Sequence, residues 1–220
     1  MEREIDYKAL YHLQDRVMDE LFALDNSFYL TGGTALHRFY YNLRYSDDLD
    51  FFTYADPLFR ESIIEILQAF KDKGIYYRYI VESKDFHRFM IEGSLQVDFV
   101  NDRVYRKGKS TLINGYKIDN KTNILANKVT AILGRDEAKD IFDLFTFAYY
   151  EAFDWGETLI IANQKSPIAK DELIYRIKSF PLSWLEKIKI IQGIEISPKQ
   201  ITQVCEDILN ESSNSLVEGV

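Results

Sequence analysis

Apolar residues recur with helical spacing near the beginning of the chain. A helix over residues 6–24 is predicted by one apolar stripe, formed by Ala9, Leu10, Leu13, Val17, Leu21 and Phe22. Asp56 and Pro57 have the pattern of an N-cap followed by a first-turn proline, and they predict a second helix that ends near Gly74. Both helices have one apolar side and are expected to pack on a core.

Short apolar or alternating runs predict the strands of a sheet. They lie at residues 28–30, 48–53, 75–81, 86–92, 95–100 and 112–118. From residue 120 onward the spacing is helical, over residues 122–133, 137–153, 156–163, 170–180, 182–191 and 198–209. We therefore expect an α+β fold, with a mixed β-sheet and flanking helices in residues 1–119 and a helical bundle in residues 120–220. The polar tail after residue 209 is expected to fray.

The most informative stretch combines a glycine turn with paired aspartates. Gly32 and Gly33 follow the strand at 28–30 and open a helix over residues 34–41, whose first N–H groups are a ready site for phosphate. On the strand that follows, Asp48 and Asp50 share one face, about 7 Å apart. Two carboxylates on an otherwise buried strand need a cation, and Mg²⁺ is the natural one beside a phosphate site.

A third carboxylate is expected near this pair. On the strand at 95–100, Leu95, Val97 and Phe99 share one face, so Asp98 lies on the other. If the two strands are neighbours, about 4.8 Å apart, Asp98 can share a metal with Asp48 and Asp50. Taken alone, a D-x-D pair is weak, because acidic pairs occur at many solvated strand ends. The glycine turn and Asp98 together favour the metal–nucleotide interpretation.

Charge and composition limit the classes of function. The chain has 220 residues and a formal net charge of −8, which argues against coating nucleic acid by bulk electrostatics. Residues 101–150 are the exception, with nine Lys or Arg against six Asp or Glu. No apolar run approaches membrane-spanning length, the first residues lack a signal-peptide pattern, and Cys205 is a lone cysteine, so we expect a soluble cytoplasmic protein.

Two helical segments in the second half contain further polar candidates. Lys128 lies inside the apolar stripe formed by Ile124 and Ile132, where a lysine either extends its ammonium to solvent or meets an anion. Asp140 and Asp143 are neighbours on the next helix, and their simplest role is pairing with nearby cations. Three histidines, at positions 12, 37 and 87, have no metal-ligand spacing and are interpreted as packing or surface residues.

These motifs resemble those of a known family. Gly32-Gly33-Thr34-Ala35-Leu36, followed by Arg44-x-Ser46-x-Asp48-Leu49-Asp50-Phe51, is similar to the AbiEii/AbiGii toxins, which include MenT-type toxins, within the polymerase-beta-type nucleotidyltransferase superfamily. The lysine helix followed by an R-x-x-x-K-D-x-x-D segment at residues 135–143 resembles the family's later motifs. The resemblance spans residues 28–144.

The resemblance implies a nucleotidyltransferase-like sheet, with the helical bundle contributing to an active-site cleft. It implies an enzyme that moves an NMP from an NTP to a hydroxyl acceptor and releases pyrophosphate. Mg²⁺, with Mn²⁺ as the alternative, would be held by Asp48, Asp50 and Asp98. The implied nucleotide-binding residues are Gly32, Gly33, Thr34, Arg44, Ser46, Lys128, Arg135 and Asp143, and the implied catalytic residues are Asp48, Asp50, Asp98, Lys128 and Asp140.

The resemblance also implies a toxin of a toxin–antitoxin or phage-defence system, with a cognate antitoxin, no membrane, and tRNA or another macromolecule as acceptor. Two other readings stay open. One is an antibiotic-type nucleotidyltransferase that acts on a small molecule, and the other is a non-catalytic nucleotide-binding interaction module. Toxicity on expression would argue against the first, and Mg-dependent NTP binding with transfer would argue against the second.

Overall fold

The computed structural model describes residues 5–217, which form two compact units. The first unit contains the chain up to Ala35, Ser46–Arg103 and Ser110–Asp119, and the second contains Leu36–Tyr45, Val104–Lys109 and the chain from Asn120 onward. The helical part therefore begins at residue 120, and two short segments from the first half of the chain belong to it.

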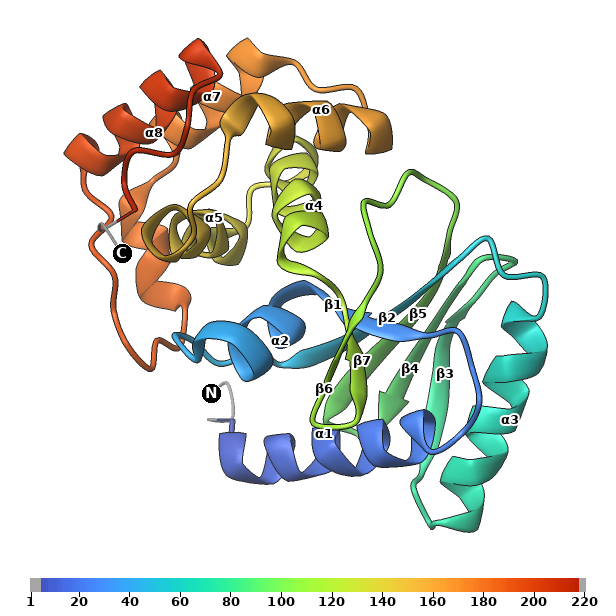
Figure 1. The fold of residues 1–220 in the computed structure, drawn as a ribbon. Coiled ribbons are helices and arrows are strands. Elements are labelled where there is room, and N and C mark those ends of the chain that lie inside the picture. The colour runs from blue at the N-terminus through green and yellow to red at the C-terminus, as the bar shows by residue number, and fades with distance from the viewer. Residues whose placement is uncertain (1–4, 218–220) are drawn as a thin grey trace. The chain divides into compact units, whose positions relative to one another are not determined.

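A mixed seven-stranded sheet forms the centre of the first unit (Figure 1). Its order is β3-β4-β5-β2-β1-β7-β6. The strands are β1 Tyr29–Thr31, β2 Asp48–Tyr54, β3 Tyr77–Glu82, β4 Phe86–Ile91, β5 Leu95–Asp102, β6 Thr111–Ile113 and β7 Tyr116–Ile118. The β2–β5 and β1–β7 pairs are parallel and the others antiparallel. This confirms the predicted α+β class with a mixed sheet.

One face of the sheet is apolar and covered by two helices, α1 (Tyr7–Phe22) and α3 (Phe59–Asp72). Phe51 of β2 is fully buried and stacks on Phe99 of β5, with ring centroids 5.5 Å apart. Phe22 of α1 contacts Phe51, and Phe59 of α3 contacts Phe28 beside β1. Because side chains alternate along each strand, Asp48 and Asp50 of β2 and Asp98 of β5 lie on the opposite face from Phe51 and Phe99.

The predicted single strand at residues 112–118 is instead a hairpin of β6 and β7. Asn114 and Gly115 between them have φ angles of 52° and 87°. An Asn-Gly pair with two positive φ angles forms the tight turn that joins antiparallel strands. The prediction of one edge strand was therefore wrong, because the turn residues inside the run were not recognised.

The predicted helix after the glycine turn is present. It starts as α2 (Gly32–Leu36) directly after β1 and continues as a π-helical turn, η1 (His37–Tyr41). Asn42 ends it with a left-handed φ of 54°. Single π-helical turns are rare, and those that occur are often found at functional sites.

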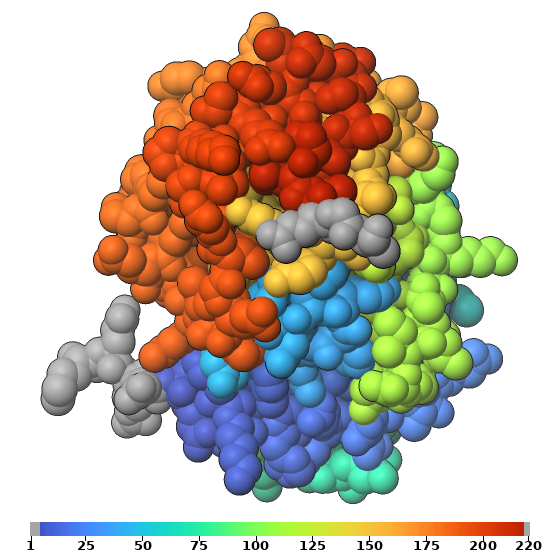
Figure 2. Space-filling view, turned by 60° about the vertical axis from the view of Figure 1, so that its left-hand side comes forward, coloured from blue at the N-terminus to red at the C-terminus, as the bar shows by residue number. Residues whose placement is uncertain are grey.

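Five α-helices and one 3₁₀-helix make up most of the second unit. They are α4 Lys121–Gly134, α5 Ala138–Tyr150, α6 Trp155–Lys165, α7 Lys170–Ser179, η2 Leu182–Lys187 and α8 Pro198–Asn210. α4 packs against α5, α6 and α7, and α7 packs against α8. The chain from α7 onward covers one side of this unit, seen as the orange-to-red surface of Figure 2. None of the helices within residues 5–217 combines the length and apolar character needed to cross a bilayer.

The prediction of a helix over residues 182–191 is only half correct. The helix ends at Lys187, and the next residues are extended because they pair with the segment before Ser46. The N–H groups of Ile191 and Tyr45 donate to the carbonyls of Leu43 and Lys189 across this pairing, at 2.8 and 2.9 Å. Main-chain bonding to a distant segment outweighs the local helical pattern here.

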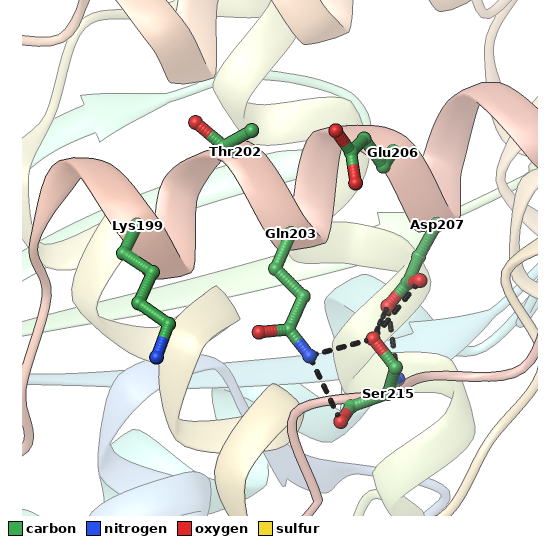
Figure 3. Close-up of a pocket in the computed structure, with 6 residues that line it drawn as sticks. All are labelled: Lys199, Thr202, Gln203, Glu206, Asp207 and Ser215. Carbon is green, nitrogen blue, oxygen red and sulfur yellow. Dashed lines mark hydrogen bonds between the residues drawn. The ribbon is translucent and has the colours of Figure 1, made fainter.

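The tail after α8 is tied down rather than frayed. Asn214 is buried and donates to the carbonyls of Ala148 and Glu151 at 2.8 and 2.9 Å. Asp207 accepts hydrogen bonds from the backbone and hydroxyl of Ser215, and Figure 3 shows both side chains turned toward each other beside Gln203. The expectation of fraying is wrong up to residue 217, and residues 218–220 lie outside the described part of the chain.

Candidate active site

Three of the predicted residues lie on the polar face of the sheet. Asp50 of β2 is directly opposite Asp98 of β5, and Thr31 of β1 is opposite Asp50 on its other side. Asp48 lies two residues before Asp50 and therefore on the same face. The sheet thus aligns the three predicted carboxylates on one surface, as the alternation of the two strands predicts.

The glycine turn is fitted directly against this row. Gly32 has a φ of 72°, and a Cβ atom added there would lie 2.5 Å from the Oδ2 atom of Asp50. Only a residue without a side chain can therefore stand between β1 and Asp50. The hydroxyl of Thr34, which is buried, donates to the main-chain carbonyl of Asp48. These two contacts fix the turn to the aspartate strand.

Asp98 has a cationic partner that sequence analysis did not identify. Arg88 of β4 donates from Nε to Oδ1 of Asp98 at 2.7 Å and from Nη2 to Oδ2 at 2.6 Å. The pKa of Arg88 is raised, first by this hydrogen bond and further by the charges of Asp98, Asp50 and Asp48. A signal for the pair was present in the sequence. A tight connection at residues 92–94 sets Ile91 opposite Leu95, and the same register sets Arg88 opposite Asp98.

The polar face fits a divalent cation through its oxygen donors. Mg²⁺ and Mn²⁺ prefer carboxylate oxygen, and Asp48 and Asp50 provide two such groups on one strand. Within residues 5–217, no three acidic, His or Cys side chains converge closely enough to form a complete metal site. Asp48 and Asp50 are the two carboxylates of β2 on this face, and Asp98 of β5 accepts hydrogen bonds from Arg88.

The remaining charged candidates lie together in the second unit. We use the name ion cluster for His37, Arg44, Lys128, Arg135, Asp140 and Asp143. Arg44 forms a bidentate pair with Asp143, with both N–O distances at 2.7 Å. Lys128 bridges the two carboxylates, at 2.9 Å from Asp140 and 2.5 Å from Asp143. The sequence analysis grouped all of these residues except His37 by resemblance, and the structure shows the contacts that join them.

Asp143 is fully buried, and its two oxygens accept hydrogen bonds from Arg44, Lys128 and His37. His37 comes from η1 and lies 2.8 Å from Asp143 through its Nε2 atom. Because a carboxylate only accepts, the proton of His37 is assigned to Nε2. The contacts give Asp143 the role of an anchor that joins the π-helical turn, the following loop and α4.

His37 was interpreted from the sequence as a packing or surface residue, so its place in the ion cluster was missed. The available signal was its position within an apolar helical segment, between Leu36 and Phe39. That signal is weak, since a histidine in such a position is often a core residue with one satisfied nitrogen.

The pKa values in the ion cluster show that its ion pairs are maintained. Burial alone would raise the pKa of Asp143, but the charges of Arg44 and Lys128 outweigh it and hold the pKa well below 3.8. Burial alone would lower the pKa of Lys128, but Asp143 and Asp140 raise it overall. Burial lowers the pKa of His37 below 6.5 despite Asp143, so this imidazole is neutral near pH 7.

The other predicted residues have simpler surroundings. Arg135 donates to both oxygens of Asp140 at 2.7 and 3.1 Å, and its own side chain is half exposed. Ser46 is buried in the first unit, where its main chain contacts the side chains of Tyr11 and Gln14. The hollow on α8 drawn in Figure 3 contains none of the predicted residues.

Solved structures with a similar fold define the class of protein. JHP933 from Helicobacter pylori has a TM-score of 0.62 and 18% identity, covering 94% of this chain and 92% of that one. MenT4, a nucleotidyltransferase toxin from Mycobacterium tuberculosis, has a TM-score of 0.53 and 17% identity, covering 79% and 66%. The fold is nucleotidyltransferase-like.

The sequence comparison gives the family. A model described as "Nucleotidyl transferase AbiEii toxin, Type IV TA system" matches residues 16–154. An uncharacterized protein of Aquifex aeolicus (strain VF5) is 32% identical over 142 residues, which cover 64% of this chain and 66% of the relative, just under two thirds of its length. The chain belongs to the AbiEii family of nucleotidyltransferase toxins, as the motifs predict.

The contact between Gly32 and Asp50 gives a prediction about stability. Gly32→Ala and Gly74→Ala both place a side chain at a positive φ, but only Gly32 has Asp50 within 4 Å. Each change costs about 1 kcal/mol of unfolding free energy through the backbone, and Gly32→Ala costs about 1–3 kcal/mol more because Asp50 must move. Urea unfolding of both variants measures the difference. Equal losses of unfolding free energy in the two variants would show that the Asp50 side chain can move away from position 32 without an energetic penalty.

Arg44 and Arg135 form a matched pair for testing the ion cluster. Arg44→Gln leaves the buried Asp143 without its bidentate partner and is expected to lower the unfolding free energy by about 3–5 kcal/mol. Arg135→Gln removes a half-exposed partner of Asp140 and is expected to cost less than about 1 kcal/mol. Denaturant unfolding of the two variants tests the order, and a larger loss for Arg135→Gln would contradict it.

The lowered pKa values predict two steps in acid stability. A neutral, buried His37 binds a proton more readily when unfolded, so unfolding free energy falls as pH drops below 6.5. Asp140 and Asp143 stabilise the fold above 3.8, and this stabilisation is lost as pH falls further through their folded pKa values. Urea midpoints from pH 8 to pH 3 measure both steps. His37→Gln should flatten the curve between about pH 6.5 and 5, and an unchanged slope would contradict the assignment.

Proposed function

We propose that this protein transfers a nucleoside monophosphate from an NTP to a hydroxyl acceptor and releases pyrophosphate. The observation that supports this best is the alignment of Asp48, Asp50 and Asp98 on one face of the sheet, with the Gly32 turn against Asp50. Membership of the AbiEii family supports the proposal, because nucleotidyl transfer needs carboxylates that hold a divalent cation.

Asp48 and Asp50 would hold the divalent cation, Mg²⁺ or alternatively Mn²⁺. When bound, this ion neutralises charge on the triphosphate and lowers the pKa of the attacking hydroxyl. The turn at Gly32, Gly33 and Thr34 would face the phosphates with its main chain, since the Thr34 hydroxyl is engaged with Asp48. The turn therefore binds through N–H groups.

The residues of the second unit would act through charge. The ion cluster combines three cationic side chains with two carboxylates and a neutral His37, which leaves an excess positive charge suited to a polyanion. Arg135 is the most exposed of these cations. Lys128 is deeply buried between Asp140 and Asp143, so its contact with phosphate remains a prediction from the family resemblance.

The family membership supports a toxin with a cognate antitoxin, acting in the cytoplasm where NTPs are available. We propose RNA, with tRNA as the first candidate, as the acceptor. The support is the basic segment at residues 101–150 in an otherwise acidic chain. A protein or small-molecule acceptor is an outcome that the assay below separates.

The assay uses the purified protein with each of the four α-labelled NTPs and with total tRNA, total protein or an added antibiotic as acceptor. Label should enter RNA with at least one NTP. Asp48→Asn and Asp50→Asn should each reduce incorporation by about 100-fold or more. Asp47→Asn changes an exposed neighbouring carboxylate just before β2 and should retain wild-type activity.

The thermal midpoint of each variant checks that it is folded. Incorporation by folded Asp48→Asn and Asp50→Asn at the wild-type rate would contradict the proposed function. If label enters protein, or only the added small molecule, the proposal that RNA is the acceptor is wrong. The proposal of nucleotidyl transfer would still hold.

A further inference from the structure

Arg88 lies beside Asp98, where it can affect whether Asp98 binds a divalent cation. In the sheet order β4-β5-β2, Asp98 lies on the middle strand, with Arg88 opposite on one side and Asp50 opposite on the other. Neighbouring strands of a sheet lie about 4.8 Å apart. Asp98 therefore has a cation on one side and a carboxylate on the other, at similar distances.

The structure shows which neighbour Asp98 contacts. Both of its oxygens accept hydrogen bonds from Arg88 of β4, at 2.7 and 2.6 Å, and Oδ2 also accepts from Gln96 at 3.4 Å. Asp98 is only 6% exposed, and a buried carboxylate beside another carboxylate needs a counter-charge. Arg88 satisfies that need through its bidentate contact.

A divalent cation beside Asp50 would satisfy the same need. A cation shared by Asp50 and Asp98 would draw the Asp98 carboxylate toward β2, at the expense of its bidentate contact with Arg88. The guanidinium also repels a nearby metal ion. Arg88 and the cation are therefore alternative partners of Asp98.

We propose that Arg88 competes with the divalent cation for Asp98, and that its guanidinium, once released, binds a phosphate group of the substrate. The fork of a guanidinium fits phosphate as well as carboxylate. Arg88 is about 10 Å, two strand spacings, from Asp50. It is a positioning residue for the cation site, and the inference rests on the proposed nucleotidyl transfer for the identity of the ligands.

A different arrangement makes the opposite prediction. A carboxylate has lone pairs enough to contact a metal ion and Arg88 together, in which case Arg88 would orient Asp98 and support metal binding. Loss of such an orienting partner typically weakens metal affinity 10–100-fold. Competition instead predicts that loss of Arg88 strengthens metal binding. The sign of the change in metal affinity therefore decides between competition and orientation.

The experiment measures Mn²⁺ binding without nucleotide, through the electron paramagnetic resonance signal of free Mn²⁺. Arg88→Gln should bind Mn²⁺ about 10-fold more tightly than the wild type, because a positive charge is removed and Asp98 becomes available. Arg88→Lys keeps the charge without the bidentate fork and should lie between the two. Unchanged or weaker binding by folded Arg88→Gln would overturn the proposal.

Arg78 provides the matched control. It is exposed on β3, and its register with Met90, and through Met90 with Gln96 and Asp48, places it on the same face of the sheet. Arg78→Gln removes the same charge from a strand one step further from Asp98 and should leave the Mn²⁺ affinity within about 2-fold of wild type. If Arg78→Gln tightens Mn²⁺ binding as much as Arg88→Gln does, the effect comes from overall charge, and the proposal that Arg88 competes for Asp98 is wrong.

The released guanidinium is tested by NTP binding in the presence of Mg²⁺. Arg88→Gln should weaken NTP binding about 10-fold while it tightens Mn²⁺ binding. Asp50→Asn distinguishes this inference from the proposed function. If the wild type binds Mn²⁺, Asp50→Asn does not, and Arg88→Gln binds no more tightly, only the role of Arg88 is wrong. If neither the wild type nor any variant binds Mn²⁺, both the role of Arg88 and the proposed function are wrong.

Discussion

Asp98 in the first unit and Asp143 in the second are both removed from water, and each is balanced by a cationic partner that constrains the packing within its own unit. Asp98 is 6% exposed and Asp143 is fully buried. Arg88 balances the first, and Arg44 with Lys128 balances the second. In each case the cation comes from a different element, so the ion pair also joins two parts of the fold. Because one unpaired buried charge costs several kcal/mol, these pairs hold their elements in a single arrangement.

A steric constraint also fixes the positions of Asp48 and Asp50 on the polar face of the sheet. Gly32 leaves room for the Asp50 carboxylate, and Thr34 is bonded to the main chain of Asp48. On the other side of the sheet, Phe51 stacks on Phe99 and prevents β2 from shifting. The carboxylates are thus held by packing from behind and by the turn beside them. This preorganisation suits the proposed site, which would receive a metal ion and a triphosphate without rearranging the backbone.

Much of this arrangement could be predicted from local pattern. The alternation of β2 and β5 placed Asp48, Asp50 and Asp98 on polar faces, and the motifs identified the family. Predictions failed where distant segments compete with local preference. Residues 188–191 are extended because their main chain bonds to Leu43 and Tyr45, and the tail packs because Asn214 reaches the end of α5. Such partners are far away in the chain and leave no periodic signal.

The sequence by itself determined the family, most of the succession of strands and helices along the chain, and which carboxylates are candidates for the site, since each depends on spacing between nearby residues. Only the tertiary structure decided which cation meets which carboxylate. Arg44 and Asp143 are separated by almost one hundred residues, and His37 joins them through a π-helical turn. Arg88 and Asp98 are close in the chain, yet their pairing depends on hairpin register and on the burial of Asp98. Burial sets the energy of a charge, and burial arises when the chain packs.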